Sequence, residues 1–137
     1  MKTWQSSEAD THLPTLLGAA REGEWQLVTA PGGAAVLADA AELAGLLAEG
    51  HRFHPEVAAD GQAVGVWLPE LQTRGAGASP DGAFAALADD MLRYAQDWQE
   101  RLRHVDAHRR RAGYVRRIQL AADRAGVLAL LEGDAAA

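Results

Sequence analysis

Residues 1–47, MKTWQSSEADTHLPTLLGAAREGEWQLVTAPGGAAVLADAAELAGLL, contain the signals for a complete succession of strands and helices. Their half-apolar start predicts an edge strand, and the leucines within residues 13–20 are spaced as on one face of a helix. Pro14 removes a backbone donor, so we expect this helix to start late or to bend there. Gly23 is expected to end it. Two more strands, joined by a Pro-Gly-Gly turn, precede a helix from Asp39. The predicted order is therefore β-α-β-β-α.

The middle of the chain is expected to form a hairpin followed by a long helix. Asp60-Gly61 is a strong turn signal, and Ala63 to Leu68 is expected to be the second strand. After a glycine-rich loop over residues 72–80, an amphipathic helix is expected to run from Asp81 to about His108. Its apolar residues recur every three or four positions. They are Phe84, Leu87, Met91, Tyr94, Ala95, Trp98 and Leu102.

The last part of the chain is read as a strand followed by a helix. Tyr114-Val115 and Ile118-Gln119-Leu120 indicate the strand, and Asp123 is expected to cap the helix. The sequence therefore predicts an α+β fold in three segments. These are an N-terminal lobe over residues 1–50, a hairpin and long helix over 51–108, and a partner-binding segment over 109–137.

Composition restricts the classes of function. The chain has 137 residues, a net charge of -6 and no cysteine. The negative charge argues against broad binding to nucleic-acid phosphates, which requires a basic surface. The lack of cysteine removes disulfides and thiol chemistry, as suits a reducing compartment. No apolar run approaches the roughly 20 residues of a membrane helix, and residues 1–8 contain no apolar signal core. We therefore expect a cytoplasmic protein with no membrane contact.

Few residues suggest chemistry. His104 and His108 lie four positions apart on a predicted helix, a spacing that can hold a metal, but a solvated helix end is the favoured interpretation. The glycines of residues 75–81 lack the Gly-Lys-Ser/Thr step of a phosphate loop. The carboxylates of the long helix are interpreted as a solvated face with arginine partners. We therefore expect no enzyme, no resident metal and no cofactor.

The order of elements in residues 1–47 resembles the N-terminal domain of the Phd/YefM (prevent-host-death) antitoxins. The corresponding residues are Ala9, Asp10 and His12-Leu13 in the first helix, Gly23-Glu24 after it, Val28-Thr29 in the next strand, and Ala34 to Leu37 in the strand after the turn. Asp10 replaces an arginine of the family pattern, and Ala30-Pro31 replace its basic turn. Lys2 and Arg21 are the remaining nearby cations for phosphate contact.

A second, shorter resemblance follows in the middle of the chain. Asp60-Gly61, the strand that ends in Pro69-Glu70-Leu71, the glycines of residues 75–77 and Ser79 to Ala83 together resemble a HicB-type antitoxin lobe. Each half of the chain thus resembles part of an antitoxin.

The resemblance implies an antitoxin of a bacterial type II toxin–antitoxin system, which neutralises a cognate protein toxin by direct binding and forms a homodimer through its N-terminal lobe. The alternatives are a DNA-binding autorepressor of its own operon, with operator DNA as partner through Lys2 and Arg21, or a small metal-binding protein. The basic cluster near the end of the long helix has three interpretations. It contacts an acidic partner surface, it compensates the dipole at the C-terminal end of the helix, or it makes a local contact with phosphate. The expected toxin contacts are Trp98, Leu102, Arg109, Arg110, Arg111, Tyr114, Arg116, Arg117, Ile118 and Leu120.

Overall fold

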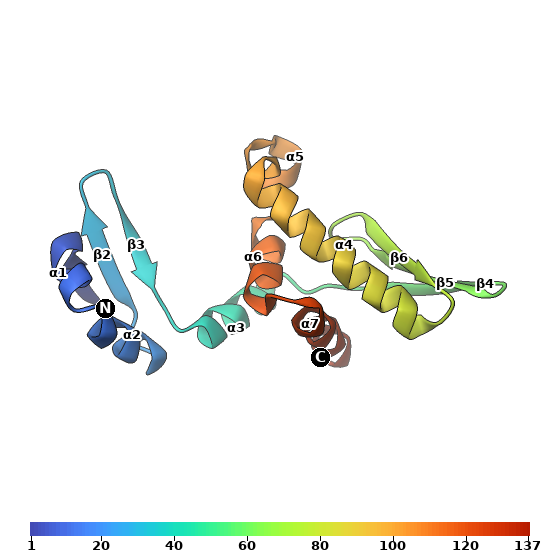
Figure 1. Ribbon diagram of the computed structural model, residues 1–137, viewed down its shortest axis with the longest axis horizontal. Helices are drawn as coiled ribbons and strands as arrows, with labels where there is room; N and C mark the ends of the chain where they lie inside the picture. The colour runs from blue at the N-terminus through green and yellow to red at the C-terminus, as the bar shows by residue number, and fades with distance from the viewer. The chain divides into compact units, whose positions relative to one another are not determined.

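The computed structural model describes all 137 residues and divides the chain into two compact units, residues 1–46 and 47–137. Helices and two separate three-stranded sheets make up both units (Figure 1), which confirms the α+β class. The predicted boundaries at residues 50 and 108 remain predictions. No helix is both long enough and apolar enough to cross a membrane.

The first unit follows the predicted β-α-β-β-α order, with its first helix in two pieces. Strand β2 lies at the centre of the sheet, parallel to β1 and antiparallel to β3. The elements are β1 (Lys2–Gln5), α1 (Ser6–Thr11), α2 (Leu13–Arg21), β2 (Gln26–Ala30), β3 (Gly33–Leu37) and α3 (Ala40–Gly50), whose last residues belong to the second unit.

Local sequence signals explain most of the boundaries in the first unit. Pro14 lies in the first turn of α2, so the chain breaks between α1 and α2, and the predicted bend is confirmed. The carboxylate of Glu8 accepts the backbone N–H of Gln5 at 3.2 Å, which satisfies a donor at the start of α1. Asp39 accepts the N–H of Glu42 at 3.0 Å and caps α3 as expected.

The core of the first unit is small. Trp4, Ala9 and Leu16 form its buried cluster, against which Val28 and Leu37 pack. The indole Nε1 of Trp4 donates to the side-chain oxygen of the buried Gln26 at 2.8 Å. Other apolar side chains of this unit remain outside the cluster, and α3 buries none of its residues. The large exposed ones are Met1, Leu13, Leu17, Val36 and Leu46.

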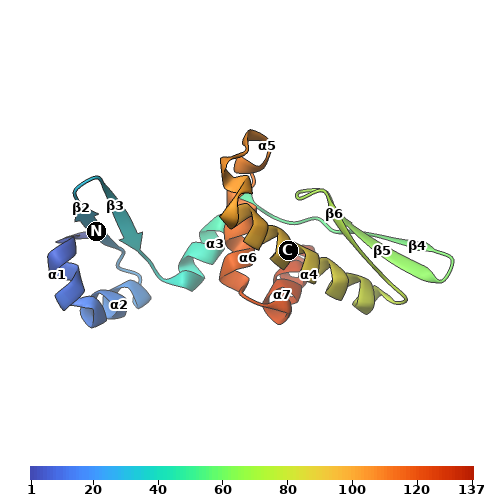
Figure 2. The same cartoon turned by 45° about the horizontal axis from the view of Figure 1, so that its top comes forward.

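The second unit is an antiparallel meander covered on one face by helices. The strands are β4 (Glu56–Asp60), β5 (Ala63–Leu68) and β6 (Thr73–Gly77), in the order β4-β5-β6. The helices are α4 (Pro80–Glu100), the 3-10 turn η1 (Leu102–His104), α5 (Asp106–Arg109), α6 (Ala112–Ala121) and α7 (Arg124–Ala136). Figure 2 shows the β4–β5 hairpin with β4 at the outer edge of the sheet.

The turn and the second strand of the β4–β5 hairpin form as the sequence predicts. Asp60 pairs with Ala63 across a two-residue turn in which Gly61 has φ 63°. Val66 and Leu68 are buried on the face that α4 covers, whereas Trp67 points to the opposite face and is 40% exposed. The predicted strand Ala63–Leu68 is confirmed.

The predicted glycine-rich loop is wrong over part of its length, because residues 73–77 form strand β6. A Cβ on Gly75 would overlap the backbone of Ala83 and Leu87, and a Cβ on Gly77 would lie 2.8 Å from the backbone nitrogen of Ala83. These glycines therefore let β6 approach α4 closely. Their spacing of two places both on the same face of the strand, and that spacing was the available sequence signal.

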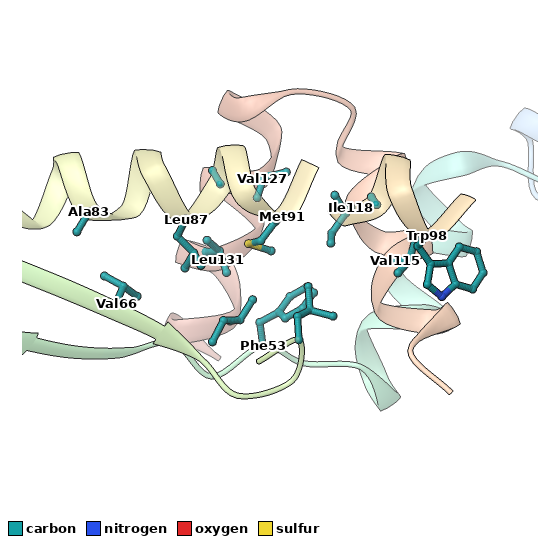
Figure 3. Close-up of a cluster of buried hydrophobic side chains, with 14 of the residues drawn as sticks. Phe53, Val66, Ala83, Leu87, Met91, Trp98, Val115, Ile118, Val127 and Leu131 are labelled. Atoms are coloured by element: carbon teal, nitrogen blue, oxygen red, sulfur yellow. The ribbon is translucent and has the colours of Figure 1, made fainter. Parts of the chain in front are cut away.

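Helix α4 starts as predicted but ends earlier. The hydroxyl of Ser79 accepts the N–H of Gly82 at 3.1 Å, with Pro80 in the first turn. The helix stops at Glu100, and residues 101–110 turn through η1 and α5. Its apolar stripe packs into one large core, part of which Figure 3 shows. That core contains Phe53, Val66, Leu68, Leu71, Ala83, Leu87, Ala88, Met91, Ala95, Trp98, Leu102, Val115, Ile118, Val127 and Leu131.

The predicted strand from Tyr114 to Leu120 is wrong, because these residues belong to helix α6. Val115 and Ile118, three positions apart, both face the core with no exposed surface. That spacing matches one face of a helix, although β-branched residues such as these favour strands in isolation. Tertiary packing against α4 therefore overrides the local preference. Asp123 accepts the N–H of Gly126 at 2.8 Å and caps α7 as predicted.

Candidate protein-interaction surface

The structure places several of the expected toxin contacts inside the second unit. Trp98, Leu102 and Ile118 belong to its core, and the indole Nε1 of Trp98 donates to the backbone oxygen of His108 at 2.9 Å. Figure 3 shows Trp98, Val115 and Ile118 near one end of the cluster. In the free chain these residues pack inside the unit and support the exposed residues around them. Their contact with a toxin remains a prediction.

Arg117 is also buried, and it forms the central ion pair of the unit. Its guanidinium donates to Asp134 on α7 at 2.6 and 3.0 Å and to the backbone oxygen of His51 at 2.8 Å. Asp134 also accepts the backbone N–H of Phe53 at 2.8 Å. Burial raises the pKa of Asp134, but the hydrogen bonds from Arg117 and Phe53 outweigh it and hold the pKa below its ordinary value. This network ties α6 and α7 to residues 51–53.

Arg111 and Tyr114 are half-buried and already have partners. Arg111 donates to the backbone oxygen of Leu71 and to the hydroxyl of Tyr94, both at 3.2 Å. The hydroxyl of Tyr94 lies 2.8 Å from Nδ1 of His108. Tyr114 lies edge-on to the ring of His51, with the ring centroids 5.1 Å apart. These contacts hold η1 and α5 in place against α4.

The accessible members of the predicted set are Arg109, Arg110, Arg116 and Leu120. Two of them belong to residues 101–110, which we name the basic segment. Only Leu102 is buried and only His108 is half-buried in this segment, so the other residues lie in solvent. Its cationic or titratable side chains are Arg101, Arg103, His104, His108, Arg109 and Arg110, against a single acidic residue, Asp106.

Two arginines of the basic segment are free of ion pairs. Arg101 pairs with Asp97 at 2.6 Å, and Arg109 pairs with Asp106 at 2.9 Å. Arg103 and Arg110 form no ion pair, and Val105 between them is 45% exposed. The segment thus presents unpaired positive charge and an apolar side chain together.

The two histidines considered for a metal lie on separate helical segments, His104 on η1 and His108 on α5, rather than four positions apart on one helix. Nδ1 of His108 is hydrogen-bonded to Tyr94, whereas His104 is exposed on η1. Nowhere in the chain do three or more His, Cys, Asp or Glu side chains gather in an arrangement that could hold a metal ion.

Lys2 and Arg21, the expected DNA contacts, lie in the first unit. Both are exposed, and the ammonium of Lys2 lies 4.3 Å from the ring centroid of Trp4. They are the only two basic side chains among residues 1–46, against six acidic ones, a net charge of -4. This charge opposes contact with a phosphate backbone.

Sequence reasoning missed an open sheet edge. Every residue of β4 is exposed, and Val57 is 55% exposed. On the face of the sheet away from α4, a shallow groove of about 330 Å³ is lined by Glu56, Ala58, Gly65, Val66, Trp67 and Arg74. Alanines and a glycine carry little hydrophobic signal, so the sequence pattern did not separate this edge from an ordinary hairpin.

The model of the PHD-like family, whose description is "antitoxin of toxin-antitoxin, RelE / RelB, TA system", matches residues 1–133. The chain belongs to this antitoxin family. Membership implies a toxin as partner. The narrower assignments to Phd/YefM and to a HicB-like segment remain predictions, and no curated protein matches the chain.

A solved structure shares the fold of this antitoxin. It is a protein from Syntrophomonas wolfei subsp. wolfei, described as an antitoxin part of a proposed toxin/antitoxin system. The two chains are 16% identical, and the alignment covers 95% of this chain and 96% of that one with a TM-score of 0.75. The arrangement of elements is therefore preserved over nearly the whole chain at low sequence identity.

Proposed function

We propose that this antitoxin neutralises its toxin by direct, stoichiometric binding, as in type II systems, without a catalytic step. The observation that carries the proposal is the basic segment, an exposed positive surface on a chain whose net charge is -6. A local charge of the opposite sign to the rest of the chain suits an acidic patch on a protein partner. The local positive charge also favours one orientation of the antitoxin against its partner.

The neighbouring side chains extend this surface along α6. Arg116 and Leu120 lie four positions apart and therefore on one face of the helix. The guanidinium of Arg116 donates to Gln99 at 2.8 Å and to Gln119 at 2.7 Å, so its position is fixed before binding. A side chain held in place loses less conformational entropy on binding. We infer that Arg109, Arg110, Arg116 and Leu120 contact the toxin.

The proposal gives the buried members of the predicted set a supporting role. Trp98 lies beneath Arg116, whose guanidinium is 5.1 Å from the indole ring centroid. Arg111 connects α6 to the backbone of Leu71. Substituting these residues would weaken toxin binding by displacing the surface rather than by removing a direct contact.

We further propose that the first unit forms a homodimer. Its buried cluster contains only Trp4, Ala9 and Leu16, and large apolar side chains of α2, β3 and α3 are exposed. Domains of this size bury too little surface to be stable without additional contacts. A second copy of the same unit can supply them through a symmetric interface.

The test is a charge reversal in the basic segment. The double variant Arg103→Glu, Arg110→Glu breaks no ion pair within the chain, so it changes the surface without changing internal contacts. We expect binding to the product of the neighbouring gene, tested as the cognate toxin, to weaken by about tenfold or more, measured by calorimetry. Rescue of growth from that product should weaken in parallel.

The matched control reverses the same number of charges in the first unit. Lys2→Glu, Arg21→Glu should leave the toxin affinity within about twofold, because both residues lie in the first unit, outside the basic segment. The same control serves the autorepressor alternative, in which it would abolish binding to operator DNA. Equal loss of toxin binding in both double variants would contradict a specific role for the basic segment.

A further inference from the structure

The free edge of the second sheet is a second interaction surface. β4 pairs only with β5, and helix α4, which covers the sheet, lies against β5 and β6. All five residues of β4 are exposed, and no lysine or proline interrupts the strand. Natural sheets usually protect such edges, because an open edge offers unpaired backbone groups to another strand.

The turn geometry identifies which backbone groups are free. Gly61 has a positive φ and Gln62 does not, as in a type II′ turn, and such a two-residue turn closes on a hydrogen-bonded pair. Asp60–Ala63, Ala58–Gly65 and Glu56–Trp67 are therefore the hydrogen-bonded pairs. The N–H and C=O groups of Val57 and Ala59 point away from β5 instead, toward the open edge.

The side chains beside this edge specify the charge of a partner. Glu56 and Asp60 lie on the face away from α4, one at each end of the strand, with Ala58 between them. On this face Trp67 of β5 lies opposite Glu56, and Arg74 of β6 lies opposite Trp67. On the opposite face, Val57 is 55% exposed. An added strand would thus place cations against two carboxylates and an apolar residue against Val57.

A second copy of this chain is a poor occupant of the edge. In the antiparallel register that uses the whole strand, β4 pairs with itself about Ala58 and brings Glu56 of each copy opposite Asp60 of the other. Two pairs of like charges would then face each other directly, which destabilises a sheet. Both copies also carry a net charge of -6.

We propose that β4 accepts a strand of the toxin by edge-to-edge addition, with Lys or Arg of that strand at the positions facing Glu56 and Asp60. The backbone bonds of Val57 and Ala59 supply affinity, and the two carboxylates select a basic sequence. This inference rests on the proposed direct binding of the toxin, but it concerns a surface separate from the basic segment. The open edge of β4 and the basic segment would then contact different parts of the toxin.

The test is residue-resolved amide hydrogen exchange of the full-length antitoxin, alone and in complex with the product of the neighbouring gene, tested as the cognate toxin. In the free protein we expect the amides of Val57 and Ala59 to exchange quickly and those of Ala58 and Asp60 to be protected. In the complex Val57 and Ala59 should become protected, with exchange slowed by about tenfold or more. This alternation distinguishes strand addition from simple coverage of a face.

Matched variants test the same contact by affinity. Ala59→Pro removes a donor that points to the open edge and should weaken toxin binding by about tenfold, while the hairpin bonds to β5 remain. Glu56→Lys should weaken it by severalfold, whereas Glu49→Lys, an exposed reversal on α3, should not.

The outcomes separate this inference from the proposed function. A complex that forms while Val57 and Ala59 stay unprotected would overturn strand addition and leave direct binding intact. Protection of both amides in the free protein at high concentration would show a second copy on the edge and would also overturn it. If no complex forms, the proposed direct binding itself fails.

Discussion

The two units of this antitoxin differ in how completely each buries its own apolar surface. The first unit has three buried apolar residues in its cluster, whereas the second has fifteen that join strand β5, two connecting segments and four helical segments into one core. Buried apolar area is the dominant favourable term in folding. The second unit is therefore stabilised by its own contacts, whereas the proposed homodimer would supply the first unit with a partner surface.

The largest expected effect is the loss of the buried ion pair of the second unit. Arg117→Ala would leave Asp134 as an unpaired charge beside the backbone of Phe53, so we expect the free energy of unfolding to fall by about 3–5 kcal/mol. Denaturant unfolding followed by circular dichroism measures this. A loss below about 1 kcal/mol would show that the pair contributes little to the second unit.

The same ion pair predicts a dependence on acid. The pKa of Asp134 is held below its ordinary value in the folded chain, so the unfolded carboxyl binds protons first as pH falls. Its stabilising contribution is present above about pH 4 and is lost as pH falls further through the folded-state pKa. Asp134→Asn should flatten this acid limb of the stability profile. An unchanged acid limb in the variant would assign it to other carboxylates.

Leucine-to-alanine substitutions in the two cores are expected to differ in how their effect on unfolding depends on protein concentration. Leu87→Ala should lower the stability of the second unit by about 2–5 kcal/mol at every protein concentration, because Leu87 is fully buried among residues of its own chain. Leu16→Ala should lower the stability of the first unit. The unfolding transition of that unit should shift with protein concentration, since a dimer is stabilised by mass action. Thermal unfolding at two concentrations a hundredfold apart tests both. If neither transition depends on concentration, the first unit is not stabilised by dimerisation.

The smallest expected effects come from glycines. Gly75→Ala should destabilise the second unit by about 1–3 kcal/mol, because the added methyl group would force β6 away from α4. Gly18→Ala, in α2 of the first unit, meets no atom within 4 Å and should stabilise by about 0.5–1 kcal/mol. Gly133→Ala in α7 has the same open surroundings and serves as the control within the second unit. Equal effects at residues 75 and 133 would refute the close approach of β6.

Much of the fold could be predicted because its signals are local. Pro14, Gly23, Asp39 and Gly61 each act on the backbone within four residues, and the predicted bend, turns and caps follow them. The candidate site was predictable only in part. Arg109 and Arg110 are accessible, as a run of arginines suggests, whereas Arg117 is buried against Asp134, seventeen positions along the chain.

Local sequence signals were sufficient to predict the α+β class, the order of elements in the first unit, and the turn and second strand of the β4–β5 hairpin. Contacts between distant segments, in contrast, make residues 73–77 a strand and residues 112–121 a helix, and they give Arg117 its buried partner. Each of those outcomes depends on contact with α4 or α7. Propensity describes a residue and its neighbours in the chain, whereas burial and charge pairing are set by residues far away in sequence.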